Sequence, residues 1–180
     1  MLVAQNMNWK IFRESTQSKW QDSEVYSNVH GYQIQPGTKW NSGLTNFELS
    51  SFESMIGFKL PYPYKDMLSE INGFDRDSVN VHGSEEPEEY LRNCYKYPDD
   101  IDKVKWLLDE VEESKEYVIE ALKKSGCAGK NIEGFLPLYG HRVLVVLEDK
   151  QLSPVISIVG DDVIVYGSAL EEYWNNEFKL

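Results

Sequence analysis

The amino-acid sequence predicts an α+β domain with a largely antiparallel sheet. Helical patterns come first along the chain, and short β-branched runs joined by turn residues follow in its last third. Strand and helix patterns do not alternate, which argues against a parallel sheet. With 180 residues, of which 41% are hydrophobic, the chain is long enough to build one sizeable core. We therefore expect a single domain over residues 1–180.

The N-terminal region contains one weak and one strong helix signal. Residues 1–43 show weak periodicity and many turn residues, so we expect a loop-rich N-terminal extension with a short helix near residues 9–14. The strong signal begins at Thr45, where the sequence TNFE (residues 45–48) is that of a capping box. Apolar residues then follow at helical spacing, and Gly57 supplies the left-handed residue that commonly ends a helix.

A second helix and a short strand follow. The Leu-Pro elbow at residues 60–61 is expected to be extended, because a residue before proline avoids the α region. Apolar side chains then repeat at helical spacing from Tyr64 to Ile71, and Asn72-Gly73 ends that helix. The alternation at residues 79–81 predicts a short strand.

Residues 84–126 read as an acidic helical insertion. Apolar positions from Ile101 to Leu122 follow a helical period without Gly or Pro, which predicts one long helix or two helices broken near Ser114. The acidic residues fall mostly outside the apolar stripe, so we expect them to face water.

The C-terminal part predicts an antiparallel sheet and a closing helix. Strands are expected at residues 135–138, 143–147, 154–159 and 163–166. The sequence SALE at residues 168–171 reads as a second capping box. The helix that begins there is expected to turn the side chains of Leu170, Tyr173, Trp174 and Phe178 toward the core.

The chain carries a net charge of −12, and most of this charge lies in the middle segment. Residues 85–120 contain 13 acidic and five basic residues, which gives the segment a net charge of −8. Direct binding to nucleic acid or to an anionic membrane is not expected, because both need clustered Lys and Arg. No stretch is apolar enough to cross a membrane and the N-terminus lacks a secretory pattern, so we expect a cytoplasmic protein.

Residue types that carry chemistry are few and scattered. His30, His82 and His141 lack the spacing of metal ligands, and Cys94 and Cys127 lie far apart in the sequence, which favours free thiols over a zinc site. We expect no metal, no cofactor and no catalytic residues, and we interpret the chain as a non-enzymatic protein.

Three short motifs leave a choice between a functional and a structural role. His141-Arg142 could contact an anion or act as an acid/base pair, but a role at a strand end with a carboxylate partner is favoured. Asp161-Asp162 could be paired acids, but adjacent turn residues point apart, so a role in the turn is favoured. Trp40 could form the wall of a pocket beside Asn41-Ser42-Gly43, although a plug over the first strong helix is favoured.

Two groups of residues resemble the signatures of one protein family. The first group is Phe52-Glu53, Gly57-Phe58, Leu60-Pro61, Tyr64, Leu68 and Asn72-Gly73, preceded by Pro36-Gly37 and Trp40-Asn41-Ser42-Gly43-Leu44. The second group is the sequence PLYGHR at residues 137–142, Pro154-Val155-Ile156-Ser157, Asp162-Val163-Ile164, Tyr166-Gly167 and Leu170 to Phe178. In this order and spacing they are similar to the SUKH superfamily of the Smi/Knr type, over most of residues 36–83 and 135–178. The acidic middle segment matches no part of that pattern.

The resemblance implies an α+β domain with a curved antiparallel sheet and flanking helices. It also implies a function by binding. Bacterial members are regarded as immunity proteins that neutralise secreted toxins, many of them nucleases, and fungal members regulate cell-wall synthesis as interaction hubs. The family has no agreed catalytic residues, so none is transferred to this chain.

Charge and resemblance together predict an immunity protein that blocks a cationic toxin with an acidic surface. A nuclease groove is cationic because it holds phosphates, and a dense acidic patch can both occupy it and steer association. The alternative is a regulatory or scaffold module that binds a peptide or a small molecule between the helices and the sheet. Taken singly, each acidic residue is more readily explained as part of a solvated face. The candidate contact residues are Glu85, Glu86, Glu88, Glu89, Asp99, Asp100, Asp102, Asp109, Glu110, Glu112 and Glu113, with Tyr90, Tyr95 and Tyr97 as exposed aromatics.

Overall fold

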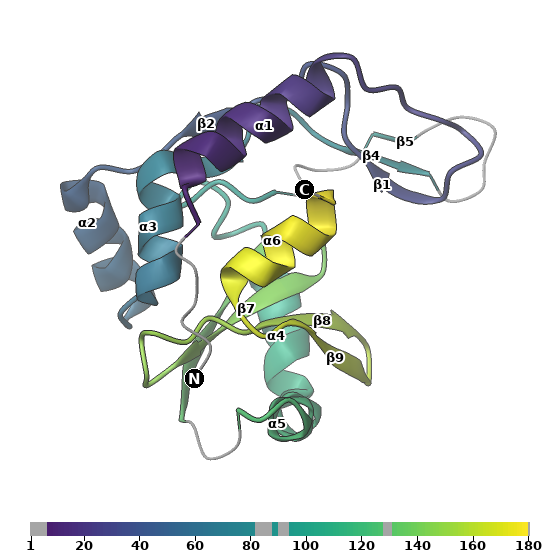
Figure 1. Cartoon of the computed structure of the whole chain (residues 1–180). Helices are drawn as coiled ribbons and strands as arrows, with labels where there is room; N and C mark the ends of the chain where they lie inside the picture. Colours follow the sequence, from purple (N-terminus) through teal and green to yellow (C-terminus); the bar gives the residue numbers. More distant parts are fainter. Residues whose placement is uncertain (1–6, 82–87, 90–93, 128–130, 180) are drawn as a thin grey trace.

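Helices and antiparallel sheets pack around a shared core, as expected for an α+β domain (Figure 1). The computed structural model describes residues 7–81, 88–89, 94–127 and 131–179. Within these residues the chain forms six helices and three antiparallel sheets. None of these helices combines the length and the apolar character that crossing a membrane requires.

The N-terminal helix is longer than the sequence suggested. Helix α1 (Trp9–Gln21) begins after Asn8, whose side chain accepts a hydrogen bond from Ile11 N at 3.0 Å. It buries one face, formed by Trp9, Phe12, Thr16 and Trp20. The predicted helix at residues 9–14 is present but continues to Gln21, so the expectation of a loop after residue 14 is wrong there. The sequence understates its length because the buried face includes a threonine that the apolar pattern does not count.

Two helices follow as predicted, but only the first has the predicted caps, and Asn72-Gly73 does not end the second. Helix α2 (Asn46–Ile56) has the capping box at Thr45 and Glu48, and its C-cap Gly57 has φ +81°. Helix α3 (Tyr62–Glu70) follows the Leu-Pro elbow and ends one residue before Ile71. Instead of closing that helix, Ile71 begins strand β3 (Ile71–Phe74).

The strands form three antiparallel sheets. The first has the order β1 (Gly31–Gln33), β4 (Val79–Val81) and β5 (Glu88–Glu89), and the second pairs β2 (Trp40–Ser42) with β3. The third is a four-stranded meander of β6 (Ile132–Tyr139), β7 (Arg142–Leu147), β8 (Val155–Val159) and β9 (Asp162–Gly167). The strands predicted at residues 79–81 and in the C-terminal part are confirmed, whereas β1, β2, β3 and β5 were not predicted.

An extended segment joins the second sheet to the third. Cys94 forms an isolated bridge with Tyr139, and its carbonyl accepts a hydrogen bond from Phe74 N at 3.3 Å. Tyr95 N donates to Leu138 O at 3.2 Å. This segment therefore lies between β3 and β6 and links the two sheets, which positions the acidic segment that follows it.

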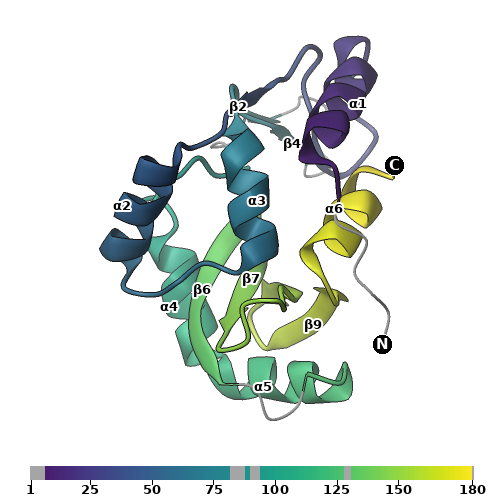
Figure 2. The same cartoon turned by 60° about the vertical axis from the view of Figure 1, so that its left-hand side comes forward.

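The acidic segment forms two helices rather than one. Helix α4 (Lys105–Glu113) and helix α5 (Lys115–Lys124) meet at Ser114, where the sequence left room for a break. Their buried side chains, such as Leu107 and Val118, pack against one face of the four-stranded sheet in a core with Val143 and Ile156. The sheet lies between α5 and α6 (Figure 1), and Figure 2 shows α4 behind β6.

The closing helix covers the opposite face of that sheet. Helix α6 (Leu170–Phe178) buries Leu170, Tyr173, Trp174 and Phe178, as predicted. The predicted capping box at residues 168–171 is wrong, because the N-cap is Ala169, which makes no side-chain cap hydrogen bond. Glu172, not Glu171, accepts a hydrogen bond from Ser168 N, at 2.8 Å, because Glu171 is turned into the protein.

Candidate functional site

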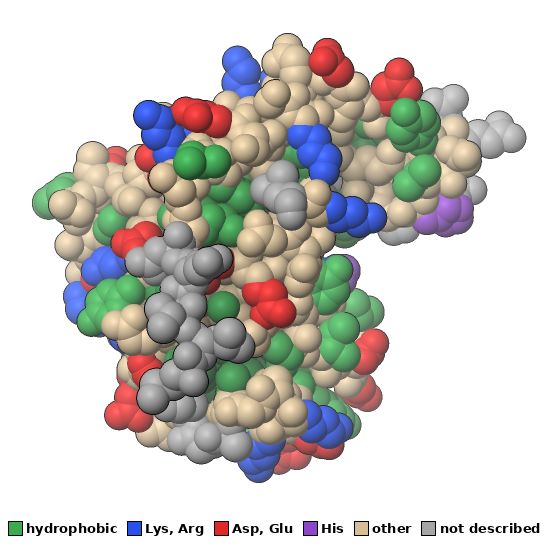
Figure 3. Space-filling model, viewed as in Figure 1, with side chains coloured by type: hydrophobic (Ala, Val, Ile, Leu, Met, Phe, Trp, Pro, Cys, Tyr) green, Lys and Arg blue, Asp and Glu red, His purple; other side chains and the backbone are tan. Residues whose placement is uncertain are grey.

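The acidic segment presents a row of carboxylates to solvent. Among the described residues, its exposed members lie on the turn before α4 and along α4 and α5. We call this set the acidic surface: Asp99, Asp102, Asp109, Glu112, Glu113, Glu116 and Glu120. In the view of Figure 3, Asp and Glu side chains are scattered among Lys and Arg, and α4 lies behind the sheet in this orientation (Figure 1).

A tryptophan lies within the acidic surface. Trp106 on α4 is 57% exposed. Asp109 and Glu113 follow it by three and seven positions, which places all three side chains on the same side of the helix. Asp102 lies four positions before it, in the preceding turn. A large, exposed aromatic ring framed by carboxylates is typical of a contact surface, since Trp is enriched at the energetic centres of interfaces.

The ion pairs of the acidic surface are local and exposed. Asp102 binds Lys105 at 2.6 Å, and Glu112 binds Lys115 at 3.0 Å. Such exposed pairs contribute little stability and are screened by salt. Glu113 has no cation within 4.0 Å among the described residues. Asp99 and Glu120 are paired with Lys96 and Lys124 in the same way, so four of the seven carboxylates of the acidic surface have a local lysine partner. The other carboxylates remain available to a cationic partner.

Hydrogen bonds fix helix α4 on the sheet. Glu110 Oε1 accepts from Gly160 N at 2.8 Å, and Ser114 Oγ donates to Gly160 O at 3.3 Å. Leu107 and Val111 of the same helix are fully buried. The turn between β8 and β9 thus holds the C-terminal end of α4, so that a partner meets a preformed surface with little ordering cost. Glu110 is half-buried by this contact and belongs to the support of the surface rather than to its exposed part.

Five of the candidate contact residues fall where little or nothing is described. Glu85, Glu86 and Tyr90 lie outside the described residues. The backbones of Glu88 and Glu89 form β5, which pairs with β4. The side chains of these two residues also lie outside the description.

Two of the expected contact residues are buried, and the expectation for them is wrong. The Asp100 side chain is 1% exposed, and its carboxylate accepts from Lys96 N and from Lys103 Nζ, both at 2.8 Å. Tyr97 is also 1% exposed, and its ring stacks on Phe52 at 5.0 Å. Both side chains have partners inside the protein. The acidic sequence around them gives no sign of these partners.

Tyr95 is half-buried, so the expectation that it is exposed is only partly right. Its hydroxyl donates to Gly140 O at 2.8 Å. Burial raises the pKa of this phenol, so it stays protonated and keeps that hydrogen bond. The Tyr95 hydroxyl therefore links the segment between β3 and β6 to the β6–β7 turn. Contact with a partner would come from other residues.

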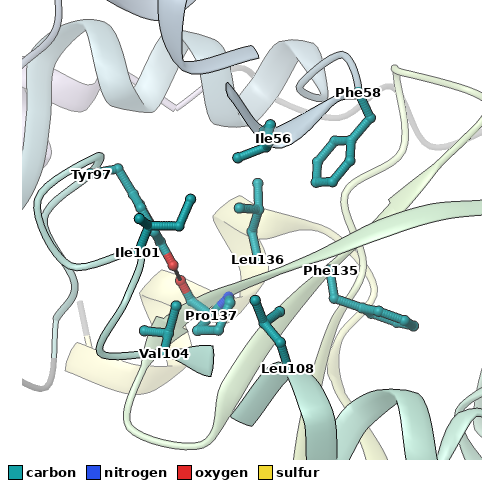
Figure 4. Close-up of a pocket in the computed structure, with 9 residues that line it drawn as sticks. All are labelled: Ile56, Phe58, Tyr97, Ile101, Val104, Leu108, Phe135, Leu136 and Pro137. Carbon is teal, nitrogen blue, oxygen red and sulfur yellow. Dashed lines mark hydrogen bonds between the residues drawn. The ribbon is translucent and has the colours of Figure 1, made fainter. Parts of the chain in front are cut away.

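An apolar pocket of about 170 Å³ lies on the other side of α4. It is enclosed by the α2–α3 turn, the turn before α4 and strand β6 (Figure 4). Its single side-chain hydroxyl, that of Tyr97, donates to Pro137 O at 2.7 Å. The residues that line it are Ile56, Phe58, Tyr97, Ile101, Val104, Leu108, Phe135, Leu136 and Pro137.

The acidic surface and the pocket share helix α4. Trp106 and Leu108 are two positions apart, so their side chains project about 200° apart around the helix axis. Asp109 and Glu112 fall on the exposed arc between these two directions. The pocket mouth and the exposed tryptophan thus flank a strip that carries these carboxylates and Lys105. The exposure of Trp106 could have been predicted from the sequence, because this residue falls outside the apolar stripe of α4.

The His141-Arg142 pair is engaged within the protein. The Arg142 guanidinium lies 4.1 Å from the ring centre of Tyr166, donates to Ser157 Oγ at 2.8 Å and faces the Glu177 carboxylate at 3.6 Å. Its Nη1 also contacts His141 Nε2. Burial and the neighbouring guanidinium lower the pKa of His141. These contacts match the structural interpretation of the pair at a strand end with a carboxylate partner.

The remaining motifs also have structural places. Trp40 is buried, and its indole N–H donates to Thr16 Oγ1 at 2.8 Å, so it packs against α1 instead of lining a pocket. Cys94 and Cys127 carry free thiols. The described residues contain no group of three or more His, Cys, Asp or Glu side chains that could hold a metal ion.

Comparisons with protein-family models, with curated proteins and with solved structures found no match for this chain. The geometry of the acidic surface and of the pocket is therefore the basis of the functional argument that follows.

Proposed function

We propose that this chain is a cytoplasmic, non-enzymatic binding protein that docks its acidic surface onto a cationic protein. The observation that carries the proposal is the exposure of Trp106, at 57%, between carboxylates on a helix that is fixed to the sheet. Burying such a ring supplies contact area at the centre of an interface, and the carboxylates around it steer a positively charged partner. Asp109 and Glu113 are the exposed carboxylates of α4 that lie on its side of the helix.

The resemblance to the SUKH superfamily supports a toxin as the partner. In this proposal the chain is an immunity protein, and the toxin is a cationic enzyme such as a nuclease. A surface that holds phosphates is necessarily rich in Lys and Arg. The acidic surface would cover it and so keep the nucleic acid away.

The test is the association of the purified chain with the toxin encoded beside its gene, measured at two salt concentrations. Replacing Trp106 by Ala is expected to weaken the complex by about 30-fold, the effect of removing a residue worth about 2 kcal/mol. Replacing Asp109 and Glu113 by Asn and Gln is expected to slow association at low salt and to reduce its dependence on salt. The Phe47→Ala variant is the matched control, since Phe47 is 81% exposed but lies on α2.

Two results would contradict the proposal. One is an association rate that does not respond to salt. The other is an equal affinity of the Trp106 and Phe47 variants for the toxin. In either case the acidic surface is only a solvated face.

The second candidate function is a regulatory or scaffold module that binds a peptide or a small molecule. The pocket between the α2–α3 turn, α4 and β6 is the observation that favours it. At about 170 Å³ this pocket is smaller than the roughly 300–1,000 Å³ typical of drug-sized ligands. A free ligand would therefore have to be small. Saturable binding of a peptide without any toxin neutralisation would favour this second function.

A further inference from the structure

We infer that the apolar pocket beside α4 receives an aromatic ring of the cationic partner, a side chain the size of phenylalanine. The identity of that partner rests on the proposed function, but the pocket and its preference can be tested on the chain alone. Three properties of the pocket support the inference: its chemistry, its size and its position relative to the acidic surface.

The pocket walls offer a ligand no free side-chain donor. Eight of the nine lining side chains are hydrocarbon only, and the ninth, Tyr97, has its hydroxyl committed to Pro137 O at 2.7 Å (Figure 4). A polar or charged group placed there would lose its water without gaining a partner, which costs free energy. The occupant is therefore apolar throughout.

The pocket has the size of a single ring. A cavity of about 150 Å³ lined by Leu, Ile and Phe in another protein binds benzene. This pocket measures about 170 Å³ and has aromatic walls from Phe58, Tyr97 and Phe135. Ring-on-ring contacts of this kind add to the gain from apolar burial. A phenyl ring matches both the volume and the walls.

The pocket is open at a mouth formed by half-buried side chains. Ile56, Phe58, Ile101 and Leu108 are half-buried, whereas Tyr97 and Val104 deeper inside are buried. Figure 4 shows Ile56 and Phe58 reaching in from the α2–α3 turn opposite Leu108 of α4. A side chain from a partner can thus enter without the chain unfolding.

The acidic surface reaches the pocket mouth. Asp109 and Glu112 lie on the arc of α4 between Leu108 and Trp106. A helix is only about 10–12 Å across, whereas a standard interface covers about 800 Å² on each partner. One partner can therefore contact Trp106 and fill the pocket together. Charge complementarity then requires Lys or Arg beside the inserted ring.

The first experiment uses benzene as the probe on the isolated protein. Titration is followed by NMR through the methyl groups of Ile56, Leu108 and Leu136. Saturable shifts of these signals are expected in the natural chain, and their loss is expected in the Ile101→Phe variant, whose larger side chain fills the mouth. The Ile119→Phe variant, at an exposed position of α5, is the matched control and should bind benzene as the natural chain does. Absence of shifts in the natural chain overturns the inference even if the filled variant fails to fold.

The second experiment uses the toxin as the partner. The Ile101→Phe variant is expected to bind it at least about tenfold more weakly than the Ile119→Phe control does. If Trp106→Ala weakens the complex but the filled pocket does not, this inference is wrong and the proposed function stands. If neither change matters, both are wrong. Benzene binding together with a weaker complex of the filled variant supports the inference.

Discussion

The side chain of Asn72 holds the backbone of Tyr97 with two hydrogen bonds. Asn72 Nδ2 donates to Tyr97 O at 2.6 Å, and Tyr97 N donates to Asn72 Oδ1 at 2.9 Å. The two residues are 25 positions apart, and both are buried. These two hydrogen bonds take the place of backbone strand pairing between β3 and the segment that leads into α4. Asn72 therefore helps to fix the segment that leads into α4.

Replacing Asn72 by Ala is expected to destabilise the protein by about 2–4 kcal/mol, because it leaves the N–H and the C=O of Tyr97 buried without partners. The Asn72→Asp variant keeps an acceptor for Tyr97 N but sets a buried carboxylate against Tyr97 O, so a loss at least as large is expected at neutral pH. Urea unfolding gives both values. The Asn175→Ala variant, at an exposed position of α6, serves as the control. An unchanged midpoint for Asn72→Ala would contradict this role.

Glu53 joins helices α2 and α3 at the elbow between them. Its buried carboxylate accepts from Leu60 N at 3.1 Å, from Lys59 Nζ at 2.8 Å and from Lys65 Nζ at 3.0 Å. Burial pushes the pKa of Glu53 up, but these donors outweigh it and leave the pKa below its ordinary value. A lowered pKa stabilises the folded state above the unfolded-state pKa, and that stabilisation is lost as the pH falls through the folded-state pKa.

The Glu53→Gln variant is therefore expected to be less stable than the natural chain at pH 7, by about 2 kcal/mol, the scale of a hydrogen bond to a charged group. The difference should shrink in acid, below pH 4.5, the ordinary carboxyl pKa. Urea midpoints at neutral and acidic pH measure it, with Glu14→Gln on the exposed side of α1 as the control. A difference that stays constant with pH would show that the charge of Glu53 is not involved.

Local rules predicted α2 and α3, whereas α1 depends on a distant partner. The capping box at Thr45 and the C-cap at Gly57 involve neighbouring residues only. The buried face of α1 contains Thr16, whose hydroxyl donates to Phe12 O and accepts from Trp40 Nε1, both at 2.8 Å. Trp40 is 24 residues away. A polar residue that is buried because of such a partner breaks the apolar pattern, so the sequence understates the helix.

The candidate site was predictable only in its charge. Helical spacing placed most acidic residues of α4 and α5 in solvent, and the same spacing places Trp106 there. Burial of Asp100 depends on its bonds to Lys96 and Lys103, and burial of Tyr97 on its stacking with Phe52. The pocket requires β6 to pack beside the α2–α3 turn. Contacts between segments so far apart leave no periodic signal in the chain.

Phe58 covers Gly134 on β6, where a side chain has no room. A Cβ placed on Gly134 would lie 2.3 Å from Cε1 of the Phe58 ring. The Gly134→Ala variant is therefore expected to push the ring aside and to lose about 1–2 kcal/mol of stability, the usual cost of overpacking. In a Phe58→Ala background the same change should cost less than about 0.5 kcal/mol, since the two positions are coupled. Equal costs in both backgrounds would mean that the ring does not pack there.

Two neighbouring glutamates of α6 are expected to respond to pH in opposite ways. Burial raises the pKa of Glu171, whose Oε2 is buried without a hydrogen-bond partner among the described residues. The folded state then holds a proton that the unfolded state has released, so stability falls as the pH rises from 4.5 through the folded-state pKa. Glu172 has a lowered pKa because Ser168 donates to it through its hydroxyl and its N–H. The stabilisation that the Glu172 carboxylate provides is present at neutral pH and is lost in acid.

The Glu171→Gln variant, which cannot ionise, is expected to be more stable than the natural chain at pH 7 by about 1 kcal/mol, the scale of an unsatisfied buried group. Below pH 4 the stabilities of the variant and of the natural chain should converge, because the natural carboxyl is then protonated in both the folded and the unfolded state. The Glu172→Gln variant should instead be less stable at pH 7. Thermal unfolding across the pH range measures both. A Glu171→Gln variant that is less stable at pH 7 would show that its charge has a partner in the folded protein.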